Sequence, residues 1–302
     1  MNFLSKKKGL IGIKINYMIY KILIIISFIA FGCTSKEKKI HKNNREKSHK
    51  NLSKKKIIQE VGSGIVIFEL DAPKKSFIGD SKITIIRLNK DSIETYLKMA
   101  STYDSVPKTV KEWSQKYGFH LTINAGMYDV INPLLSRGFM KSETSINNLI
   151  VNPAYNGVCI MNNRKLDLID FICQNKLDLN NQESCFQSMR MLDCQGVGID
   201  WQRKKQLCSM IMMGEDEQNH IYIIFTRSPY LHQDMVGFLQ KMPFDLRLTL
   251  YLEGGPETSL YLNTPNKKLE LVGSYVSETY ETDSNKVFWP LPNVIGFKFK
   301  GK

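Results

Sequence analysis

The segment Thr249–Leu262, TLYLEGGPETSLYL, places a carboxylate, Glu253, directly after an apolar run and directly before two glycines. A carboxylate at the end of a buried strand can act as a general base or stabilise developing positive charge. Gly254 and Gly255 let a ligand approach the backbone, whose N–H groups can then bind an anion such as phosphate. The alternative is a plain tight turn with a solvated glutamate.

A second charged residue, Arg227, follows another apolar run, Ile221–Thr226. If the two strand ends face one crevice, Arg227 binds an anionic substrate while Glu253 takes part in the chemistry. This pairing predicts an enzyme that acts on an anion. A structural ion pair between the two side chains is the alternative.

The elements that position these two residues form a β-α-β pattern. Between the apolar runs, Met235, Phe238, Leu239 and Met242 recur at helical spacing, and Pro243 ends the predicted helix. The pattern predicts a strand, a turn at Arg227–Tyr230, a helix at His232–Met242 and a strand at Leu246–Leu252 that ends on Glu253-Gly254-Gly255. Such strands are expected to be parallel and buried, with their carboxyl ends at a ligand-binding crevice.

The remaining pattern predicts one α+β domain over residues 57–302, with a mixed β-sheet flanked by helices. Further strands are expected at Val61–Leu70, Lys82–Leu88, Phe119–Asn124, Leu269–Tyr275 and Val294–Lys300. Helices are expected at Ser92–Ala100 and at Thr109–Tyr117, the second ending at Gly118.

The first 56 residues read as a leader and a tether. Residues 1–32 combine early lysines with the apolar run Ile22–Phe31, which is typical of a secretory signal and too short for a comfortable membrane span. Cys33 follows at the expected break, so we predict a lipidated cysteine and a membrane-anchored lipoprotein of the cell envelope. An uncleaved anchor is the alternative. Residues 34–56 are basic and polar, and we expect a disordered tether there, making 33–56 one segment.

The net charge of +13 does not indicate a nucleic-acid partner. Its whole excess lies in residues 1–56, because residues 57–302 carry equal numbers of basic and acidic side chains. The five cysteines after Cys33 contain no C-x-x-C pair, so one or two disulfides are favoured over a metal site. Asp193 and Asp200 lack a compact ion-binding motif. We predict no cofactor, with a divalent cation as an open alternative.

Several motifs in one order resemble the phosphodiester glycosidase family, which includes the lysosomal uncovering enzyme. They lie across roughly residues 60–297 and read INAGMY at 123–128, RGFM at 137–140, QSMRML at 187–192, RSPY at 227–230 and EGGPE at 253–257. The RSPY and EGGPE motifs are similar to those of a bacterial secreted subgroup. The uncovering enzyme has an aspartate and three glycines where this chain has Glu253-Gly-Gly-Pro, and an Arg-Thr pair where this chain has Cys208-Ser209.

The resemblance implies hydrolysis of a sugar 1-phosphodiester, with release of the sugar and a phosphomonoester. The model reaction removes N-acetylglucosamine from such a group in a glycan or cell-envelope substrate. The implied catalytic residues are Glu253, Arg227 and Asn124, with Glu257 as a second candidate carboxylate. The implied substrate-binding residues are Arg137, Gln187, Arg190, Gly254 and Gly255.

Two other functions stay open at this point. One is attack at phosphorus instead of at the sugar carbon, and the other is a lipoprotein that binds glycans without catalysis. On spacing alone, Asn124 reads as a capped strand end, and Gln187 and Arg190 read as surface polarity.

Overall fold

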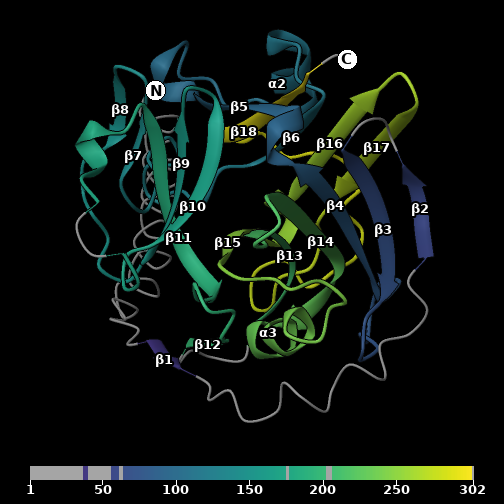
Figure 1. Cartoon of the computed structure of the whole chain (residues 1–302). Helices are drawn as coiled ribbons and strands as arrows, with labels where there is room; N and C mark the ends of the chain where they lie inside the picture. The colour runs from purple at the N-terminus through teal and green to yellow at the C-terminus, as the bar shows by residue number, and fades with distance from the viewer. Residues whose placement is uncertain (1–36, 40–55, 61–63, 175–176, 202–205, 301–302) are drawn as a thin grey trace, which may run out of the picture. The chain divides into compact units, whose positions relative to one another are not determined.

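The chain is described by a computed structural model that covers residues 37–39, 56–60, 64–174, 177–201 and 206–300. Figure 1 shows its strands and two short helices. Within those ranges no helix combines the length and the apolar character needed to span a membrane. The predicted signal segment and Cys33 lie outside the described residues.

The larger sheet has eleven strands, nine of them in the order β10-β9-β11-β15-β13-β14-β4-β3-β2. Two further strands, β7 and β8, attach to the side of β11. Its strands are β2 (Lys56–Glu60), β3 (Ile65–Asp71), β4 (Lys82–Asn89), β7 (Met140–Ser142), β8 (Ser145–Asn148), β9 (Gly157–Asn162), β10 (Lys165–Asp170), β11 (Ser184–Leu192), β13 (Leu207–Glu215), β14 (His220–Leu231) and β15 (Thr249–Gly254).

The smaller sheet has five strands in the order β17-β16-β6-β18-β5. They are β5 (Ile93–Met99), β6 (Leu121–Asn124), β16 (Ser259–Thr264), β17 (Lys267–Val272) and β18 (Asn293–Phe299). A single hydrophobic cluster joins the two sheets and includes Ile211 and Leu250 from the larger sheet and Ile123 and Leu260 from the smaller one. Burial of this cluster is the main force that holds the sheets together.

The two helices cover outer faces of these sheets. Helix α3 (His232–Leu239) packs Met235 and Val236 against a second cluster on the larger sheet. Helix α2 (Val110–Tyr117) packs Trp113 against residues of the smaller sheet. Thr109 and Glu112 form a capping box at its start, and Gly118 ends it at a φ of 64°. The α+β class and the helix at Thr109–Tyr117 are therefore confirmed.

The predicted β-α-β unit exists, but its two strands are not neighbours. Strand β13 lies between β14 and β15 and is antiparallel to both, so β14 and β15 run in the same direction across it. Every strand pairing among the described residues is antiparallel. The expected mixed sheet is thus two antiparallel sheets.

The predicted turn at Arg227–Tyr230 is wrong, because β14 continues to Leu231. The pair Cys208↔Tyr230 is followed by Met210↔Thr226, so β14 contributes two residues more than β13 between the pairs. This bulge accommodates Pro229, which cannot donate a hydrogen bond to the ladder.

The predicted helix at Ser92–Ala100 is also wrong. The segment is strand β5, with short 3-10 turns at Lys90–Ser92 and Ala100–Thr102. Its side chains alternate strictly between buried and half-buried from Ile93 to Met99. A period of two residues is the signature of a strand with one buried face.

Three residues of the segment predicted to be a disordered tether form a β-strand in the structure. Glu37–Lys39 form strand β1, which pairs with strand β12 (Ile199–Trp201). An open strand edge supplies hydrogen-bonding groups that a polar segment can use without burying apolar surface.

Candidate active site

Glu253 lies at the end of strand β15, as predicted. The register between β15 and β13 is irregular there. Its Oε1 accepts a hydrogen bond of 3.0 Å from the N–H of Gly254. Burial raises the pKa of the Glu253 carboxyl well above its ordinary value, the charge of Glu257 raises it further, and Arg137 opposes both effects. Such surroundings favour the protonated form of this carboxyl.

Glu257 is the second carboxyl of the site and ends the 3-10 turn Gly255–Glu257. Burial raises its pKa as well, while a hydrogen bond from Tyr128 lowers it. The Tyr128 hydroxyl donates to Glu257 Oε1 at 3.4 Å. Burial and the charges of both carboxylates raise the pKa of Tyr128 itself, so its hydroxyl stays protonated. Two neighbouring carboxyls with raised pKa values can provide a proton donor and a proton acceptor.

The positive charge of Arg137 lowers the pKa of Glu253. Its backbone is held on both sides, since its N–H donates to Met127 O and its carbonyl accepts from Asn152 Nδ2, both at 3.0 Å. Its side chain is exposed and forms no hydrogen bond or ion pair with the described residues. Arg137 therefore acts on Glu253 through its charge, and its guanidinium is available for an anion.

Asn124 ends β6, and both ends of its amide bond to the backbone after the glycines. Its Nδ2 donates to Glu257 O at 3.0 Å and its Oδ1 accepts from Ser259 N at 2.8 Å. The prediction that this amide holds sugar hydroxyls is not what the geometry shows. Asn124 instead positions the backbone that carries Glu257.

Gly254 and Gly255 also differ from the prediction of a bare anion-binding backbone. A Cβ at Gly254 would overlap the Tyr251 hydroxyl, and Gly255 has a φ of 77° with Val276 against its Cα. The N–H of Gly254 already donates to Glu253. These glycines are needed for close packing and for a left-handed backbone that side chains disfavour.

Arg227 lies elsewhere than predicted. Its guanidinium donates to the carbonyls of Val272, Asp283 and Asn285 and pairs with the Asp283 carboxylate at 2.8 Å. Asn285 in turn bonds to the Pro256 carbonyl at 3.4 Å. Arg227 thus braces the loop that packs on the turn between the two carboxyls, and the charge of Arg137, not that of Arg227, acts on Glu253.

Gln187 is buried, and its side chain is fully engaged. Its Oε1 accepts from the N–H groups of Phe139 and Asn152, both at 2.9 Å, and its Nε2 donates to the carbonyls of Asn152 and Tyr155. The reading as surface polarity is wrong, because Gln187 is buried and its amide bonds to backbone groups. Gln187 holds together the loops that carry Arg137.

Arg190 is buried in an ion pair away from the carboxyls. Its Nη1 lies 2.7 and 2.6 Å from the two carboxylate oxygens of Asp170. A disulfide between Cys173 and Cys194 covers this pair. Among the described residues, the one group of side chains with metal-ligand spacing is this Asp170 and the two cysteines. Since the sulfurs are bonded together and Asp170 is paired, the group offers no ligand set.

An aromatic cluster lies next to Glu253. The ring of Trp201 meets Tyr251 edge-on at 5.2 Å and stacks on His232 at 3.6 Å. Burial lowers the pKa of His232 to about 3, so this imidazole is neutral. Burial raises the pKa of the neighbouring Cys208 thiol to about 12, which removes it as a nucleophile.

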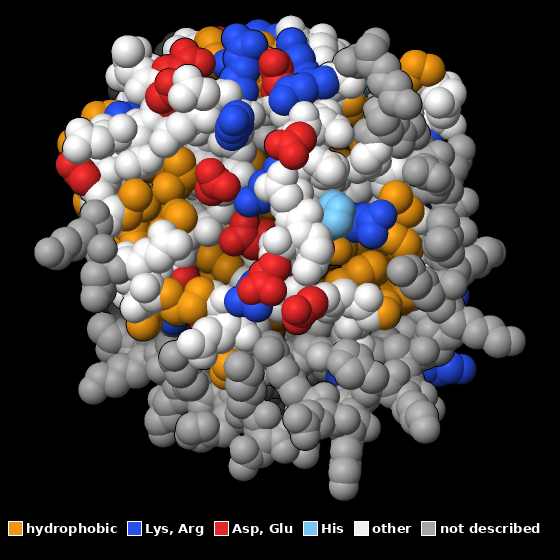
Figure 2. Space-filling model, in the orientation of Figure 1, with side chains coloured by type: hydrophobic (Ala, Val, Ile, Leu, Met, Phe, Trp, Pro, Cys, Tyr) orange, Lys and Arg blue, Asp and Glu red, His pale blue; other side chains and the backbone are white. Residues whose placement is uncertain are grey.

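Tyr128 is the residue of this site that sequence reasoning did not select. It ends the INAGMY motif, so its position in that motif was the available signal. On the face of the molecule seen in Figure 2, acidic and basic side chains are interspersed and no large block of one sign appears. This distribution agrees with a small charged ligand more than with a nucleic acid.

Comparisons with known proteins place the fold. No protein-family model matches the chain, and no curated protein sequence matches it. Among solved structures, the catalytic domain of zebrafish N-acetylglucosamine-1-phosphodiester alpha-N-acetylglucosaminidase, auto-inhibited by its pro-peptide, is similar with a TM-score of 0.53 and 11% identity, over 90% of this chain and 91% of that one.

Two further structures are similar. A hypothetical protein from Synechocystis has a TM-score of 0.50 and 13% identity, over 78% of this chain and 62% of that one. A putative exported protein from Burkholderia pseudomallei has a TM-score of 0.43 and 6% identity, over 72% and 73%. At these identities the first two comparisons establish the fold.

Proposed function

We propose that this protein is an exported, membrane-tethered hydrolase that cleaves a sugar 1-phosphodiester in a glycan or cell-envelope substrate. The observation that carries the proposal is the pair of carboxyls with raised pKa values, Glu253 and Glu257, joined through the turn after β15, with Arg137 acting electrostatically on Glu253. The likeness of the fold to an N-acetylglucosamine-1-phosphodiester alpha-N-acetylglucosaminidase supports the choice of reaction. N-acetylglucosamine is therefore the first sugar to test.

The reaction needs a proton acceptor, a proton donor and an anion site. Water attacks the sugar C1 while the bond from C1 to the bridging phosphate oxygen breaks. Glu257 accepts the proton from water; burial raises its pKa, and the hydrogen bond from Tyr128 opposes that rise. Glu253 donates its proton to the departing oxygen, so the products are the free sugar and a phosphomonoester.

Arg137 binds the phosphodiester in this scheme. A guanidinium binds two phosphate oxygens at once and stabilises the charge that develops on the leaving group. A bound anion near the pair also favours the protonated form of Glu253, because like charges oppose its ionisation. Asn124, Gln187 and Arg227 act by holding the backbone around these groups.

The cellular setting belongs to the same proposal. A lipid on Cys33 and the basic segment after it tether the domain outside the cytoplasm, where a cell-envelope glycan is accessible. The proposal includes no cofactor and no nucleic-acid partner.

The experiment uses the full-length protein in detergent with UDP-N-acetylglucosamine, with and without EDTA. We expect wild type to release free N-acetylglucosamine and Glu253→Gln to lose at least about 100-fold in kcat. Glu270→Gln, an exposed glutamate on β17, is the matched control and keeps full activity. An active Glu253→Gln protein contradicts the proposed proton donor, and loss of activity with EDTA contradicts the absence of a metal.

Hydrolysis in water labelled with oxygen-18 identifies the bond that breaks. Attack at C1 places the label in the sugar, whereas attack at phosphorus places it in the phosphomonoester. Label in the phosphomonoester would overturn the glycosidase assignment and leave a phosphodiesterase.

A further inference from the structure

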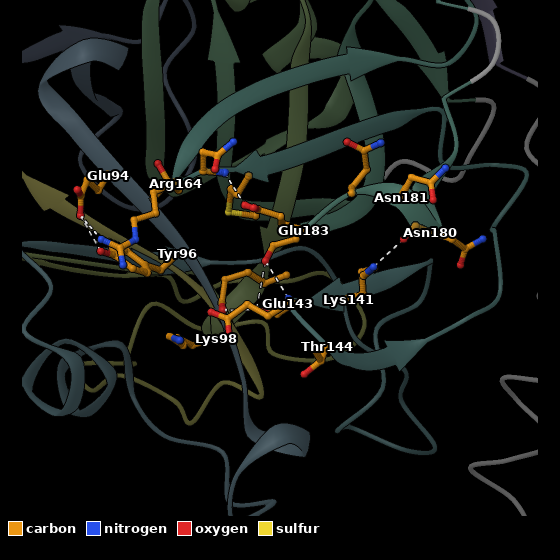
Figure 3. A pocket seen from close by; sticks show the side chains of 17 residues that line it. Glu94, Tyr96, Lys98, Lys141, Glu143, Thr144, Arg164, Asn180, Asn181 and Glu183 are labelled. Atoms are coloured by element: carbon orange, nitrogen blue, oxygen red, sulfur yellow. Dashed lines mark hydrogen bonds and ion pairs between the residues drawn. The ribbon is translucent and has the colours of Figure 1, made fainter.

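A large open groove lies apart from the candidate active site. Its volume is 1170 Å³, and Figure 3 shows the side chains that line it. Its walls come from β5, the β7–β8 hairpin, the β9–β10 turn and the segment 180–184. It shares no residue with the Glu253 site, and it exceeds the roughly 300–1,000 Å³ of small-molecule pockets. A ligand that fills it is an oligomer.

The charges of this groove balance. Its wall carries three carboxylates, Glu94, Glu143 and Glu183, and three cations, Lys98, Lys141 and Arg164. A polyanion such as nucleic acid or polyphosphate needs an excess of cations, which the groove does not have. Its charge therefore favours a neutral ligand.

The groove is also unsuited to a peptide strand. The outer edge of β5 is already closed, because Thr95 N donates to Arg164 O and Leu97 O accepts from Ser142 Oγ, both at 2.9 Å. The apolar side chains in the wall, Leu97 and Met161, are 2% and 3% exposed. A peptide bound by strand addition requires an open edge and pockets for its side chains.

Several polar side chains around the groove are exposed to solvent and have hydrogen-bond donors and acceptors that could bind a ligand. The side chains of Thr144, Asn163 and Asn180 are exposed and make no hydrogen bond to the described residues. Amides and hydroxyls that donate and accept at once match the hydroxyl groups of sugars. The 3-10 turn at Leu179–Asn181, capped by Asp178, fixes the backbone that presents Asn180.

One aromatic ring, Tyr96, stands in the wall and is held rigidly. Its hydroxyl donates to Glu94 at 2.7 Å, its ring packs on Phe119 at 5.5 Å, and the guanidinium of Arg164 lies 5.3 Å from its centre. Figure 3 shows Glu94, Tyr96 and Arg164 grouped on one side of the groove, with Asn180 and Asn181 on the other. Lys98 and Lys298 also lie over this ring, 6.0 and 5.4 Å from its centre. The fixed ring contributes a contact for a sugar, and the polar wall opposite contributes partners for its hydroxyls.

We propose that this groove binds a neutral oligosaccharide chain, as a glycan-binding site separate from the Glu253 site. The proposal does not depend on the reaction assigned to Glu253. If the Glu253 site hydrolyses a glycan phosphodiester, the groove holds a neutral part of the same polymer.

Calorimetric titration of the full-length protein tests the proposal with chitohexaose, cellohexaose and maltohexaose. We expect at least one neutral hexasaccharide to bind, and Thr144→Ala/Asn180→Ala to weaken its binding at least five-fold. Tyr96→Ala, which removes the ring, is expected to weaken it at least ten-fold. Asn263→Ala, an exposed asparagine on β16 outside the groove, is the matched control and binds as wild type.

Three results would overturn the inference. They are the absence of binding to all three hexasaccharides, unchanged binding in both groove variants, or binding of polyphosphate in preference to every sugar. Glu253→Gln separates the two sites: it keeps hexasaccharide binding if the groove is responsible and loses it if the sugar binds at the Glu253 site. Hydrolysis of UDP-N-acetylglucosamine by the groove variants stays at the wild-type rate, so failure of the catalytic proposal and failure of this one are distinguishable.

Discussion

At the scale of single residues, the site is defined by two glutamates with raised pKa values. Glu253 and Glu257 are separated by three residues; burial raises the pKa of both, and the charge of Glu257 raises that of Glu253 further. Tyr128 and Arg137 act on different members of the pair, since Tyr128 bonds to Glu257 and Arg137 lowers the pKa of Glu253. Burial and the charge of Glu257 raise the pKa of Glu253 well above its ordinary value, whereas Tyr128 opposes the rise at Glu257. In the proposed reaction Glu253 is therefore the donor and Glu257 the acceptor.

Tyr128→Phe tests the acceptor role. The Tyr128 hydrogen bond lowers the pKa of Glu257, so its loss raises that pKa. We expect the acidic limb of the profile of kcat/KM against pH to move to higher pH, with a fall in kcat of about 10-fold. An acidic limb that stays in place, or moves to lower pH, contradicts the assignment of Glu257. Tyr103→Phe, a tyrosine 45% exposed outside the site, is the control.

Glu253→Gln also affects stability. Because the folded protein raises the pKa of Glu253, the folded state binds the proton more tightly than the unfolded state. Stability from this residue is therefore full below the unfolded pKa and declines as pH rises toward the folded pKa. We expect Glu253→Gln to melt higher than wild type at pH 8, and the difference to shrink toward pH 5. In a domain of this size, each 1 kcal/mol corresponds to about 2–4 °C. Equal melting temperatures at pH 8 count against a raised pKa.

At the scale of elements, the site depends on how closely β15 and the turn after it are packed. Gly254 lies under the Tyr251 hydroxyl, and a Cβ at Gly273 would overlap the carbonyl of Gly255. Asn124 and Asn285 bond to carbonyls on the same turn. The turn is held by contacts from β6 and from the loop that follows β17, so its geometry is set outside its own sequence.

Gly254→Ala tests this packing. Overlap with Tyr251 is expected to cost about 1–3 kcal/mol of stability and to displace Glu253, with loss of hydrolysis. The matched control is Gly237→Ala in α3, where an added Cβ meets nothing within 4 Å. That change stabilises the helix by about 0.5–1 kcal/mol. Chemical denaturation measures both, and equal effects of the two alanines would contradict a specific requirement at Gly254.

At the scale of the whole molecule, two sheets share one hydrophobic core. An ion pair and a disulfide stabilise the region around β10 and β11. The buried pair Arg190 and Asp170 joins β11 to the end of β10, and the disulfide Cys173–Cys194 closes a loop of the same region. The resemblance implied substrate binding by Arg190, whereas the structure holds its guanidinium in a buried ion pair with Asp170. The groove around Tyr96 is built from β5 and from the hairpins near β7 and β9, and neither the ion pair nor the disulfide is among its lining residues.

Arg190→Met tests the structural role. Removing the cation leaves Asp170 buried without its partner, and such losses cost about 3–5 kcal/mol. Arg190→Met combined with Asp170→Leu is expected to recover much of this stability, because no unpaired charge remains. If Arg190 instead binds substrate, Arg190→Met leaves the free energy of unfolding unchanged and raises KM. Urea denaturation of the single and double variants decides between the two.

Local patterns were sufficient for part of the fold. Helix α2 follows from Thr109, Glu112 and Gly118, whose capping interactions lie within a few residues of the helix. Strand β5 could also have been predicted, because its buried side chains alternate with a period of two residues. The prediction of a helix there was wrong because it assumed a helical period. The extension of β14 through Pro229 was not available locally, because it depends on a bulge against β13.

The sequence by itself determined the class of fold, the carboxylate at the end of β15 and the charge balance that disfavours nucleic acid. These follow from periodicity, residue type and counting, which need no knowledge of distant contacts. Only the tertiary structure decided that the charge of Arg137, not that of Arg227, acts on Glu253, that Tyr128 bonds to Glu257, and that the side chains of Gln187 and Arg190 are held inside the fold. Each of these contacts joins segments from different strands, and side-chain partners across a sheet are set by strand order and register, which spacing along the chain does not reveal.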